Sequence, residues 1–176
     1  MKILETSLNG VLLIQPDVYE DDRGIFKVTF NESLYRKAKI EYKYLQDNLS
    51  VSKKNVLRGL HFQKSNPQGK LVTCIRGQVL DVVVDIDKNS NTFGQYYSVT
   101  LSDSNHKQLW IPPGYAHGFY VLSSAAHFLY KCTSYYDPNS ESGIIWNDPA
   151  LSIKWPTENP ILSLKDQNLP TIDKIF

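Results

Sequence analysis

Two chemically active side chains lie inside an apolar run at residues 56–63, which reads VLRGLHFQ. Such a run is typical of a buried strand, yet it contains Arg58 and His61. A buried charge is costly unless it is paired, so these side chains must be paired or functional. Arg58 could pair with Asp81 or Asp85 of the run LDVVVDID, and His61 could bond a core carbonyl. Alternatively, an imidazole with a reference pKa of about 6.5 could serve as a general base.

A second stretch, WIPPGYAHGF at residues 110–119, favours the functional interpretation. Its prolines fix a turn, and Gly114 permits close backbone approach just before His117. The pattern is similar to the second motif of the cupin jelly rolls, whose metal site also needs a His-x-His followed by Glu. Here the first motif reads His61-Phe62-Gln63 and lacks the second histidine. A stable metal site usually needs three protein ligands, so we expect no metal.

Without a metal, His61 would act by proton transfer or simple binding, and three other residues could assist. Lys70 could stabilise a developing oxyanion, Tyr130 could return a proton, and Asp166 could hold the base in one tautomer. Each also has a plain structural interpretation. Lys70 could be a solvated strand end, Tyr130 a core aromatic residue and Asp166 a turn residue. Spacing alone does not bring these groups together.

The composition limits the number of domains and the class of protein in which these residues can be positioned. The chain has 176 residues, 41% hydrophobic and 21% charged, with a net charge of +1. One domain spanning residues 1–176 is therefore expected, with no surface for nucleic acid. Cys74 and Cys132 each lie in an apolar run, which favours buried free thiols. No signal peptide or membrane-spanning run is apparent, so we expect no membrane partner and a cytoplasmic location.

Short runs rich in β-branched and aromatic residues, bounded by Gly, Pro, Asn, Asp or Ser, predict many strands. Only residues 32–42 are predicted to be helical, and residues 76–78 suggest a tight hairpin between two strands. The Pro-rich tail from about residue 155 is expected to cap one end of the domain. This pattern predicts an all-β fold, an antiparallel sandwich or barrel with few short helices.

The chain resembles, over nearly its whole length, the deoxysugar-nucleotide epimerases of the dTDP-4-dehydrorhamnose 3,5-epimerase family. Any one of the matching segments is weak evidence, but eight in order are specific. They are DDRGIF, QDNLSVSKKNVLRGLHFQ, QGKLVTCIRGQVLDVVVDI, SNTFGQYYSV, LWIPPGYAHGFYVLS, LYKCTSYYDPNSE, WNDPALSIKWP and LSLKD. The resemblance implies a cupin-type antiparallel jelly roll without cofactor or metal, and a homodimer whose N-terminal strands pack across the interface.

The resemblance also implies roles for individual residues. His61 matches the catalytic base, Asp166 its aspartate partner, Tyr130 the proton donor on the opposite face of the sugar, and Lys70 the lysine beside the keto oxygen. The positions that match substrate-binding residues are Arg23, Gln46, Asp47, Asn48, Arg58, Lys70, His117, Glu141 and Lys165.

The implied reaction converts dTDP-4-dehydro-6-deoxy-D-glucose to dTDP-4-dehydro-β-L-rhamnose by inversion at C3 and C5. The partner would be this dTDP-linked 4-keto-6-deoxy sugar. The alternatives are an epimerase that inverts only C3 or only C5, a non-catalytic sugar-nucleotide-binding jelly roll, and a metal-dependent cupin oxygenase. The His61-Phe62-Gln63 sequence disfavours the oxygenase.

Two features depart from the simple expectation. The family commonly has an F-x-E pattern after DDRGIF, but here Val28 stands where the Glu is usual, which leaves the nucleotide and sugar open. Strict strand alternation also places Arg58 and His61 on opposite faces. Either Gly59 marks a bulge, or Arg58 serves a site shared with a neighbouring chain.

Overall fold

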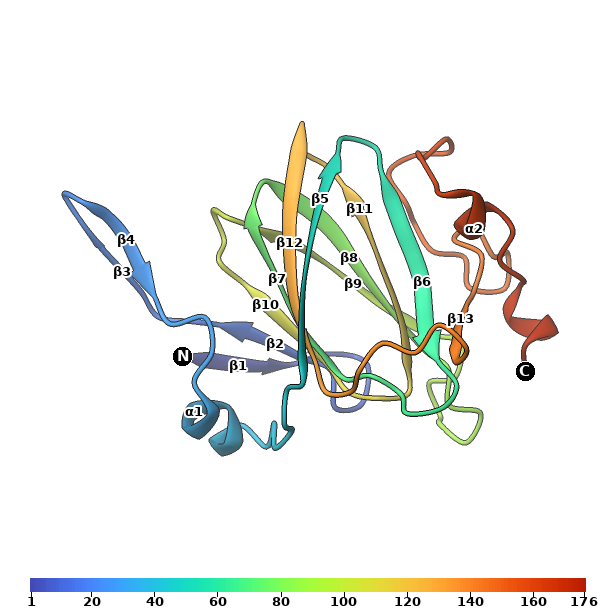
Figure 1. Cartoon of the computed structure of the whole chain (residues 1–176), viewed down its shortest axis with the longest axis horizontal. Helices are drawn as coiled ribbons and strands as arrows, with labels where there is room; N and C mark the ends of the chain where they lie inside the picture. Colours follow the sequence, from blue (N-terminus) through green and yellow to red (C-terminus); the bar gives the residue numbers. More distant parts are fainter.

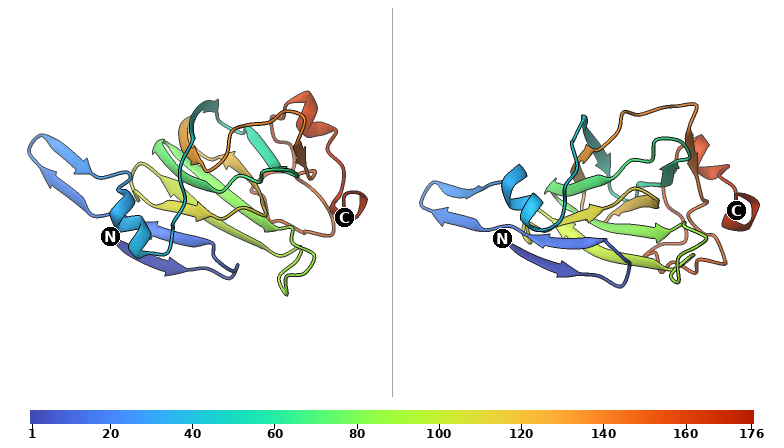
Figure 2. Two further views of the ribbon diagram at one scale, coloured as in Figure 1. Left: turned by 60° about the horizontal axis from the view of Figure 1, so that its bottom comes forward. Right: turned by 90° about the horizontal axis from the view of Figure 1, so that it is seen from below.

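The computed structural model describes residues 1–176 as two facing antiparallel sheets, with a small hairpin that projects from one end (Figures 1 and 2). The first sheet contains, in spatial order, β1 (Lys2–Glu5), β2 (Leu12–Gln15), β10 (Gln108–Ile111), β7 (Lys70–Arg76), β12 (Ala125–Cys132) and β5 (Gln46–Lys53). The second sheet contains β13 (Glu141–Gly143), β6 (Leu57–Gln63), β11 (Tyr115–Val121), β8 (Gln78–Asp85) and β9 (Tyr96–Ser102). The projecting hairpin is formed by β3 (Val18–Asp21) and β4 (Gly24–Lys27). The predicted all-β, cupin-type antiparallel jelly roll is confirmed.

The space between the two sheets is filled at one end by apolar side chains. Side chains alternate along each strand, so every second residue faces the opposite sheet. Leu109 and Phe128 of the first sheet meet Val83 and Phe119 of the second in one buried cluster. The aromatic rings of Phe119 and Phe128 pack with centroids 4.4 Å apart. This packed end leaves the other end of the sandwich free for polar side chains.

The C-terminal segment covers the outer face of the second sheet. β13 extends the second sheet beside β6, and the helix α2 (Leu164–Gln167) and the 3-10 helix η1 (Ile172–Lys174) follow it near that edge in Figure 1. Trp155, Ile172 and Ile175 pack against Val82 and Val84 of β8. The second sheet is therefore apolar on both faces, which explains the unbroken hydrophobic run VVV in β8.

The predicted tight hairpin at residues 76–78 is wrong. Strands β7 and β8 are joined by Gly77 alone, but β7 belongs to the first sheet and β8 to the second. Gly77 has φ of +80°, and a Cβ atom there would lie 2.1 Å from the Ala125 carbonyl oxygen. The left-handed conformation turns the chain from one layer into the other instead of back along the same sheet.

The predicted helix over residues 32–42 forms only in its first part, as α1 (Glu32–Lys37). The Asn31 side chain caps its N-terminus by accepting a hydrogen bond from the Leu34 N–H at 3.1 Å. Lys39 then adopts φ of +62°, which ends the helix. Tyr35 is buried, but Leu34 is 41% exposed, because the short helix packs only one of its residues deeply.

Both cysteines are buried and free, as predicted for Cys74 and Cys132. None of the helices has the length and apolar character required to span a bilayer.

Candidate active site

Strand β6 contains a bulge that brings Arg58 and His61 to the same side. On the neighbouring strand β11, His117 pairs with His61 and Phe119 pairs with Arg58, so β6 has one residue more than its partner over this interval. Gly59 adopts φ of +129°, and a Cβ there would lie 2.5 Å from the Gly118 Cα. The bulge interpretation is therefore confirmed, and only glycine fits this close approach.

His61 forms a close pair with Asp166 of α2. His61 Nε2 lies 2.6 Å from Asp166 Oδ1, with 29% of the histidine side chain and 4% of the aspartate exposed. Burial alone would raise the pKa of Asp166, but its hydrogen bonds with His61, Ser163 and the Gly59 backbone hold that pKa below the usual range. A carboxylate at Nε2 orients the ring and leaves Nδ1 as its acceptor nitrogen.

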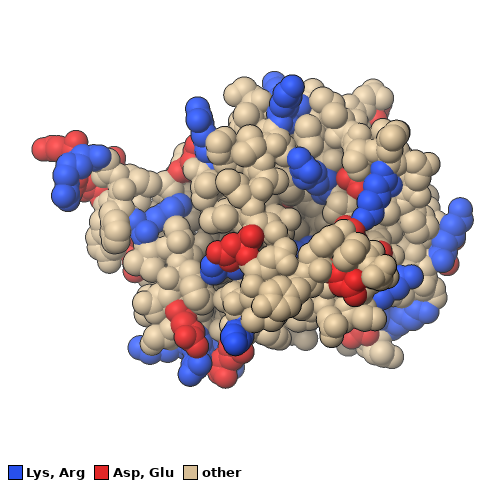
Figure 3. All heavy atoms as spheres, viewed as in Figure 1, with Lys and Arg blue, Asp and Glu red and all other residues tan.

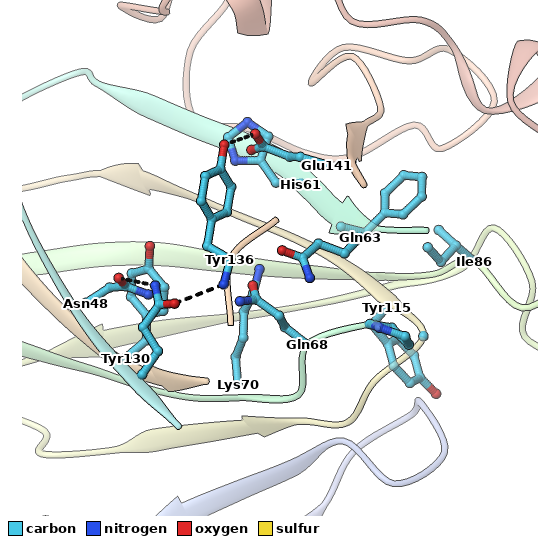
Figure 4. A pocket seen from close by; sticks show the side chains of 14 residues that line it. Asn48, His61, Gln63, Gln68, Lys70, Ile86, Tyr115, Tyr130, Tyr136 and Glu141 are labelled. Atoms are coloured by element: carbon cyan, nitrogen blue, oxygen red, sulfur yellow. Dashed lines mark hydrogen bonds between the residues drawn. The ribbon is translucent and has the colours of Figure 1, made fainter. Parts of the chain in front are cut away.

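Two adjoining cavities open between the edge strands of the two sheets, and His61 lines both. The inner cavity has a volume of about 240 Å³ and contains Asn48, Gln68, Tyr136 and Glu141 in its wall (Figure 4). The edge cavity, of about 440 Å³, is lined by residues of β5, β6, β7, β11 and β12 and by residues within 161–166 at the start of α2. The residues common to both walls are His61, Lys70 and Tyr130. These three side chains therefore surround one shared space.

Lys70 and Tyr130 enter this space from the first sheet, whereas His61 enters it from the second. Burial lowers the pKa of Lys70 and raises the pKa of Tyr130. The tyrosine is therefore a neutral O–H donor near neutral pH. The arrangement places an imidazole on one side of the shared space and a phenol O–H group on the other.

A second histidine–aspartate pair lies directly beside the first. His117 Nε2 is 2.7 Å from Asp81 Oδ1, with side chains that are 7% and 0% exposed. Burial lowers the pKa of His117 despite the neighbouring carboxylate, so the imidazole is neutral near neutral pH. His117 also lines the edge cavity.

The interpretation that Arg58 pairs with Asp81 or Asp85 is wrong. Asp81 is bonded to His117, and Asp85 accepts hydrogen bonds from the Ser90 and Thr92 hydroxyls at 2.5 Å. The Arg58 side chain instead donates to Ser52 Oγ at 3.0 Å and lines the edge cavity. Its guanidinium charge is thus available to an anion.

Polar residues of β5 and of the segment around β13 complete the walls. Gln46 Nε2 donates to Asn48 Oδ1 at 2.8 Å, and the Tyr136 N–H donates to Gln46 Oε1 at 2.9 Å. The Tyr136 hydroxyl donates to Glu141 Oε2 at 2.5 Å, and Lys165 Nζ bonds the same oxygen. Figure 3 shows basic side chains around the hollow in the middle of this face.

Two of the predicted binding residues do not reach either cavity of their own chain. Arg23 lies in the turn between β3 and β4, 90% exposed and paired with Asp21 at 2.5 Å. Asp47 points to the outer face of β5 and pairs with Lys131 at 2.8 Å. All the other predicted site residues line one or both cavities, and Asp166 lines the edge cavity beside His61.

Sequence reasoning missed β5 as a strand, and it missed Gln63, Gln68 and Tyr136 as cavity residues. The inner face of β5 carries Gln46, Asn48 and Ser50, so the strand does not show the usual apolar alternation. No cluster of three or more His, Cys, Asp or Glu side chains suited to a metal ion is present. The absence of metal in solution stays a prediction.

Comparison with known proteins places this geometry in context. The profile of the dTDP-4-dehydrorhamnose 3,5-epimerase family matches residues 5–174. The chain is 51% identical over 181 aligned residues to the dTDP-4-dehydrorhamnose 3,5-epimerase of Salmonella typhimurium, covering 99% of this chain and 97% of the relative. It is 49% identical to the enzyme of the same name from Escherichia coli, covering 100% and 97%.

A solved structure shows the same fold. The chain superposes with a TM-score of 0.97 on dTDP-6-deoxy-D-glucose-3,5-epimerase RmlC from Legionella pneumophila in complex with dTDP-4-keto-L-rhamnose, at 47% identity over 99% of this chain and 94% of that one. Profile, sequence and structure agree over the full jelly roll, so the chain is an isomerase that belongs to the dTDP-4-dehydrorhamnose 3,5-epimerase family.

Proposed function

We propose that the chain converts dTDP-4-dehydro-6-deoxy-D-glucose to dTDP-4-dehydro-β-L-rhamnose by inverting C3 and C5. The single observation that carries this proposal is the opposition of His61 and Tyr130 across one cavity, on strands from different sheets. Inversion requires removal of a proton from one face of the carbon and delivery of a proton to the other. Family membership supports the substrate class.

The 4-keto group makes this reaction accessible because it acidifies the hydrogens on C3 and C5. In each inversion His61 takes the proton from carbon, the C–H electrons form an enolate with its negative charge on O4, and Tyr130 delivers a proton from the opposite face. Asp166 positions His61 through their 2.6 Å contact. Lys70 stabilises the charge on O4, and one such donor is worth roughly 2.7–4 kcal/mol in related oxyanion sites.

The rest of the cavity wall suits a sugar diphosphate. Arg58 and Lys165 line the edge cavity and carry positive charge toward the diphosphate, with His117 beside them. Gln46, Asn48 and Glu141 offer hydrogen bonds from the inner cavity. Binding energy from these remote groups positions the ring for proton transfer.

We further propose that the protein is a homodimer in which Arg23 reaches the cavity of the partner subunit, and in which Asp47 faces the interface. Exposed apolar side chains support this proposal: Tyr19, Ile25 and Phe26 of the hairpin are 62%, 52% and 67% exposed. Leu49 and Val51, on the outer face of β5, are 56% and 59% exposed. Large exposed apolar patches mark interaction surfaces. Equilibrium sedimentation that gives only a 20.1 kDa species at micromolar concentration would contradict the dimer.

The reaction itself is tested by NMR in deuterated buffer with the 4-keto sugar carried on dTDP and, separately, on GDP or CDP. Deuterium at both C3 and C5 of the dTDP sugar, with the product trapped by a 4-ketoreductase, supports the double inversion. Deuterium at one carbon would identify a single-centre epimerase, and no exchange would identify a binding protein. Activity only with another nucleotide would overturn the rhamnose assignment. We would then attribute the changed nucleotide preference to Val28.

We also expect one domain over residues 1–176 capped by its tail, and a cytoplasmic location.

We expect the reaction to be metal-free. The set of side chains in the cavity supports this expectation, because the chemistry needs only a base, an acid and an oxyanion donor. A chelator should leave the exchange rate unchanged. Loss of activity on chelation, restored by a metal at one equivalent per chain, would contradict the metal-free mechanism.

A further inference from the structure

Lys70 is a half-buried cation in the wall of both cavities, and it has no counter-ion in contact with it. Its side chain lies between the two sheets, and none of the ion pairs within 4.0 Å includes it. Burial lowers the pKa of Lys70, and the nearby Cys132, Asp81 and Glu141 oppose that shift. A desolvated ammonium remains charged only if negative charge lies nearby.

Two of these three neighbours are poorly suited to balance the charge. Burial raises the pKa of the Cys132 thiol, so it is neutral at neutral pH. Glu141 is already bonded through one oxygen to both Lys165 and Tyr136. Asp81 differs from both, because its Oδ2 atom is buried and has no hydrogen-bond partner.

The hydrogen bond at the other oxygen of Asp81, Oδ1, does not neutralise the carboxylate. Oδ1 accepts from His117 Nε2 at 2.7 Å, and burial keeps the imidazole neutral by lowering the pKa of His117. A hydrogen bond from a neutral donor does not neutralise a carboxylate. The Asp81–His117 pair lies on the sheet opposite Lys70, and His117 lines the same edge cavity as Lys70.

We propose that Asp81 is a positioning residue whose carboxylate is the resident counter-charge of Lys70, and that it also fixes the tautomer of His117. This role rests on the proposed function, in which Lys70 acts as an ammonium at O4. Without substrate, the Asp81 carboxylate keeps Lys70 charged but does not contact it. The N–H donors of Lys70 therefore stay free for the substrate. A direct salt bridge would occupy the donors that the enolate oxygen requires.

The proposal is tested first by the titration of Lys70 itself, without substrate. The titratable groups that face Lys70 are Tyr130 and Cys132 of β12, Asp81 of β8, His117 of β11, His61 of β6 and Glu141 of β13. The probe is the ¹³Cε signal of Lys70 in lysine-labelled protein, assigned by its loss in Lys70→Met. In Asp81→Asn the midpoint should fall by about one pH unit, the lower end of a close charge effect.

Asp148→Asn is the matched control. Asp148 is 2% exposed and accepts hydrogen bonds from the backbone N–H groups of Ala150 and Ile172 at 2.8 and 2.6 Å. It is a buried aspartate whose partners are purely structural and lie outside both cavities. The Lys70 midpoint should not move in this variant. A midpoint in Asp81→Asn equal to that of the wild type overturns the proposal.

The kinetic consequence has a defined sign. A lower Lys70 pKa removes the ammonium at lower pH, so the alkaline limb of the pH profile for deuterium exchange should move to lower pH in Asp81→Asn. A variant that loses only stability would keep the wild-type limb. Because the titration needs no substrate, failure of the epimerase assignment and failure of this proposal give different results.

A stability cycle keeps the proposal testable if Asp81→Asn folds poorly. Removing either charge leaves the other uncompensated between the two sheets, so Asp81→Asn and Lys70→Met together should cost less stability than the sum of their separate costs. If Asp81→Asn alone does not fold, the double variant should fold. A double variant as unstable as the sum of the single changes overturns the proposal.

Discussion

Two histidine–aspartate pairs lie next to each other on the inner face of the second sheet, because His61 and His117 are cross-strand partners. The His61 side chain is 29% exposed, whereas that of His117 is 7% exposed. Both pairs have nearly the same separation, 2.6 and 2.7 Å. They differ in access, since His61 borders both cavities while His117 borders only one.

The two aspartates also come from different kinds of element. Asp81 lies in the middle of the central strand β8, whereas Asp166 lies in the short helix α2 of the C-terminal segment. One pair is thus built into the sheet and the other is assembled by a segment that packs onto it. We therefore expect access to the cavity, rather than the pairing itself, to determine which histidine performs proton transfer.

The largest expected effect separates the two histidines. His61→Asn should lower deuterium exchange at both C3 and C5 on the order of 10²–10⁴-fold, because the neighbouring imidazole, His117, is only 7% exposed and borders the edge cavity alone. The exchange is measured by NMR in deuterated buffer. If the His61→Asn variant exchanged near the wild-type rate while His117→Asn did not, the roles of the two pairs would be reversed.

Tyr130→Phe tests whether the His61 pair can act without its opposing acid. The enolate should still form, so deuterium exchange should persist at one or both carbons. Net inversion should fall by roughly 10²-fold, the lower end of a general-acid contribution. Retention of normal inversion by the phenylalanine variant would assign the acid to another group.

Asp166→Asn keeps the shape of the first pair and removes its charge. Losing a hydrogen bond to a charged group costs about 1.5–3 kcal/mol, equivalent to roughly a 10–100-fold loss of rate. The loss should appear mainly in kcat, because Asp166 reaches substrate only through His61. A change confined to KM would argue against its positioning role.

The pH dependence of folding should show the smallest effects, in different windows for the two pairs. The folded-state pKa of His117 is lowered by burial, so its contribution to stability is complete above about pH 6.5 and decreases as the pH falls below that value. For Asp166, whose pKa is also lowered, the corresponding loss begins below about pH 4.

Urea unfolding at a series of pH values measures both effects. His117→Gln should remove the dependence below pH about 6.5, and Asp166→Asn the dependence below about 4. Identical curves for wild type and His117→Gln over the upper window would show that His117 is not held neutral by the fold.

The sequence alone predicted much of this molecule because strand periodicity is a local property. Alternating β-branched and aromatic residues predicted the all-β fold, and a charged residue and a histidine in one apolar run drew attention to His61. The same local rule failed at β5, since a strand that lines a polar cavity carries Gln46, Asn48 and Ser50 on its inner face. The pattern that reveals a core strand is absent where the strand builds a site.

Long-range pairing decided what the sequence left open. Whether Arg58 and His61 share a face depended on the register of β11 against β6, and whether Gly77 forms a hairpin depended on which sheet β8 joined. The partner of Asp81 proved to be His117, 36 residues away along the chain. Such contacts arise when strands that are distant in sequence are packed side by side, so composition and spacing predict the residue types of the site, while only the tertiary structure determines their partners.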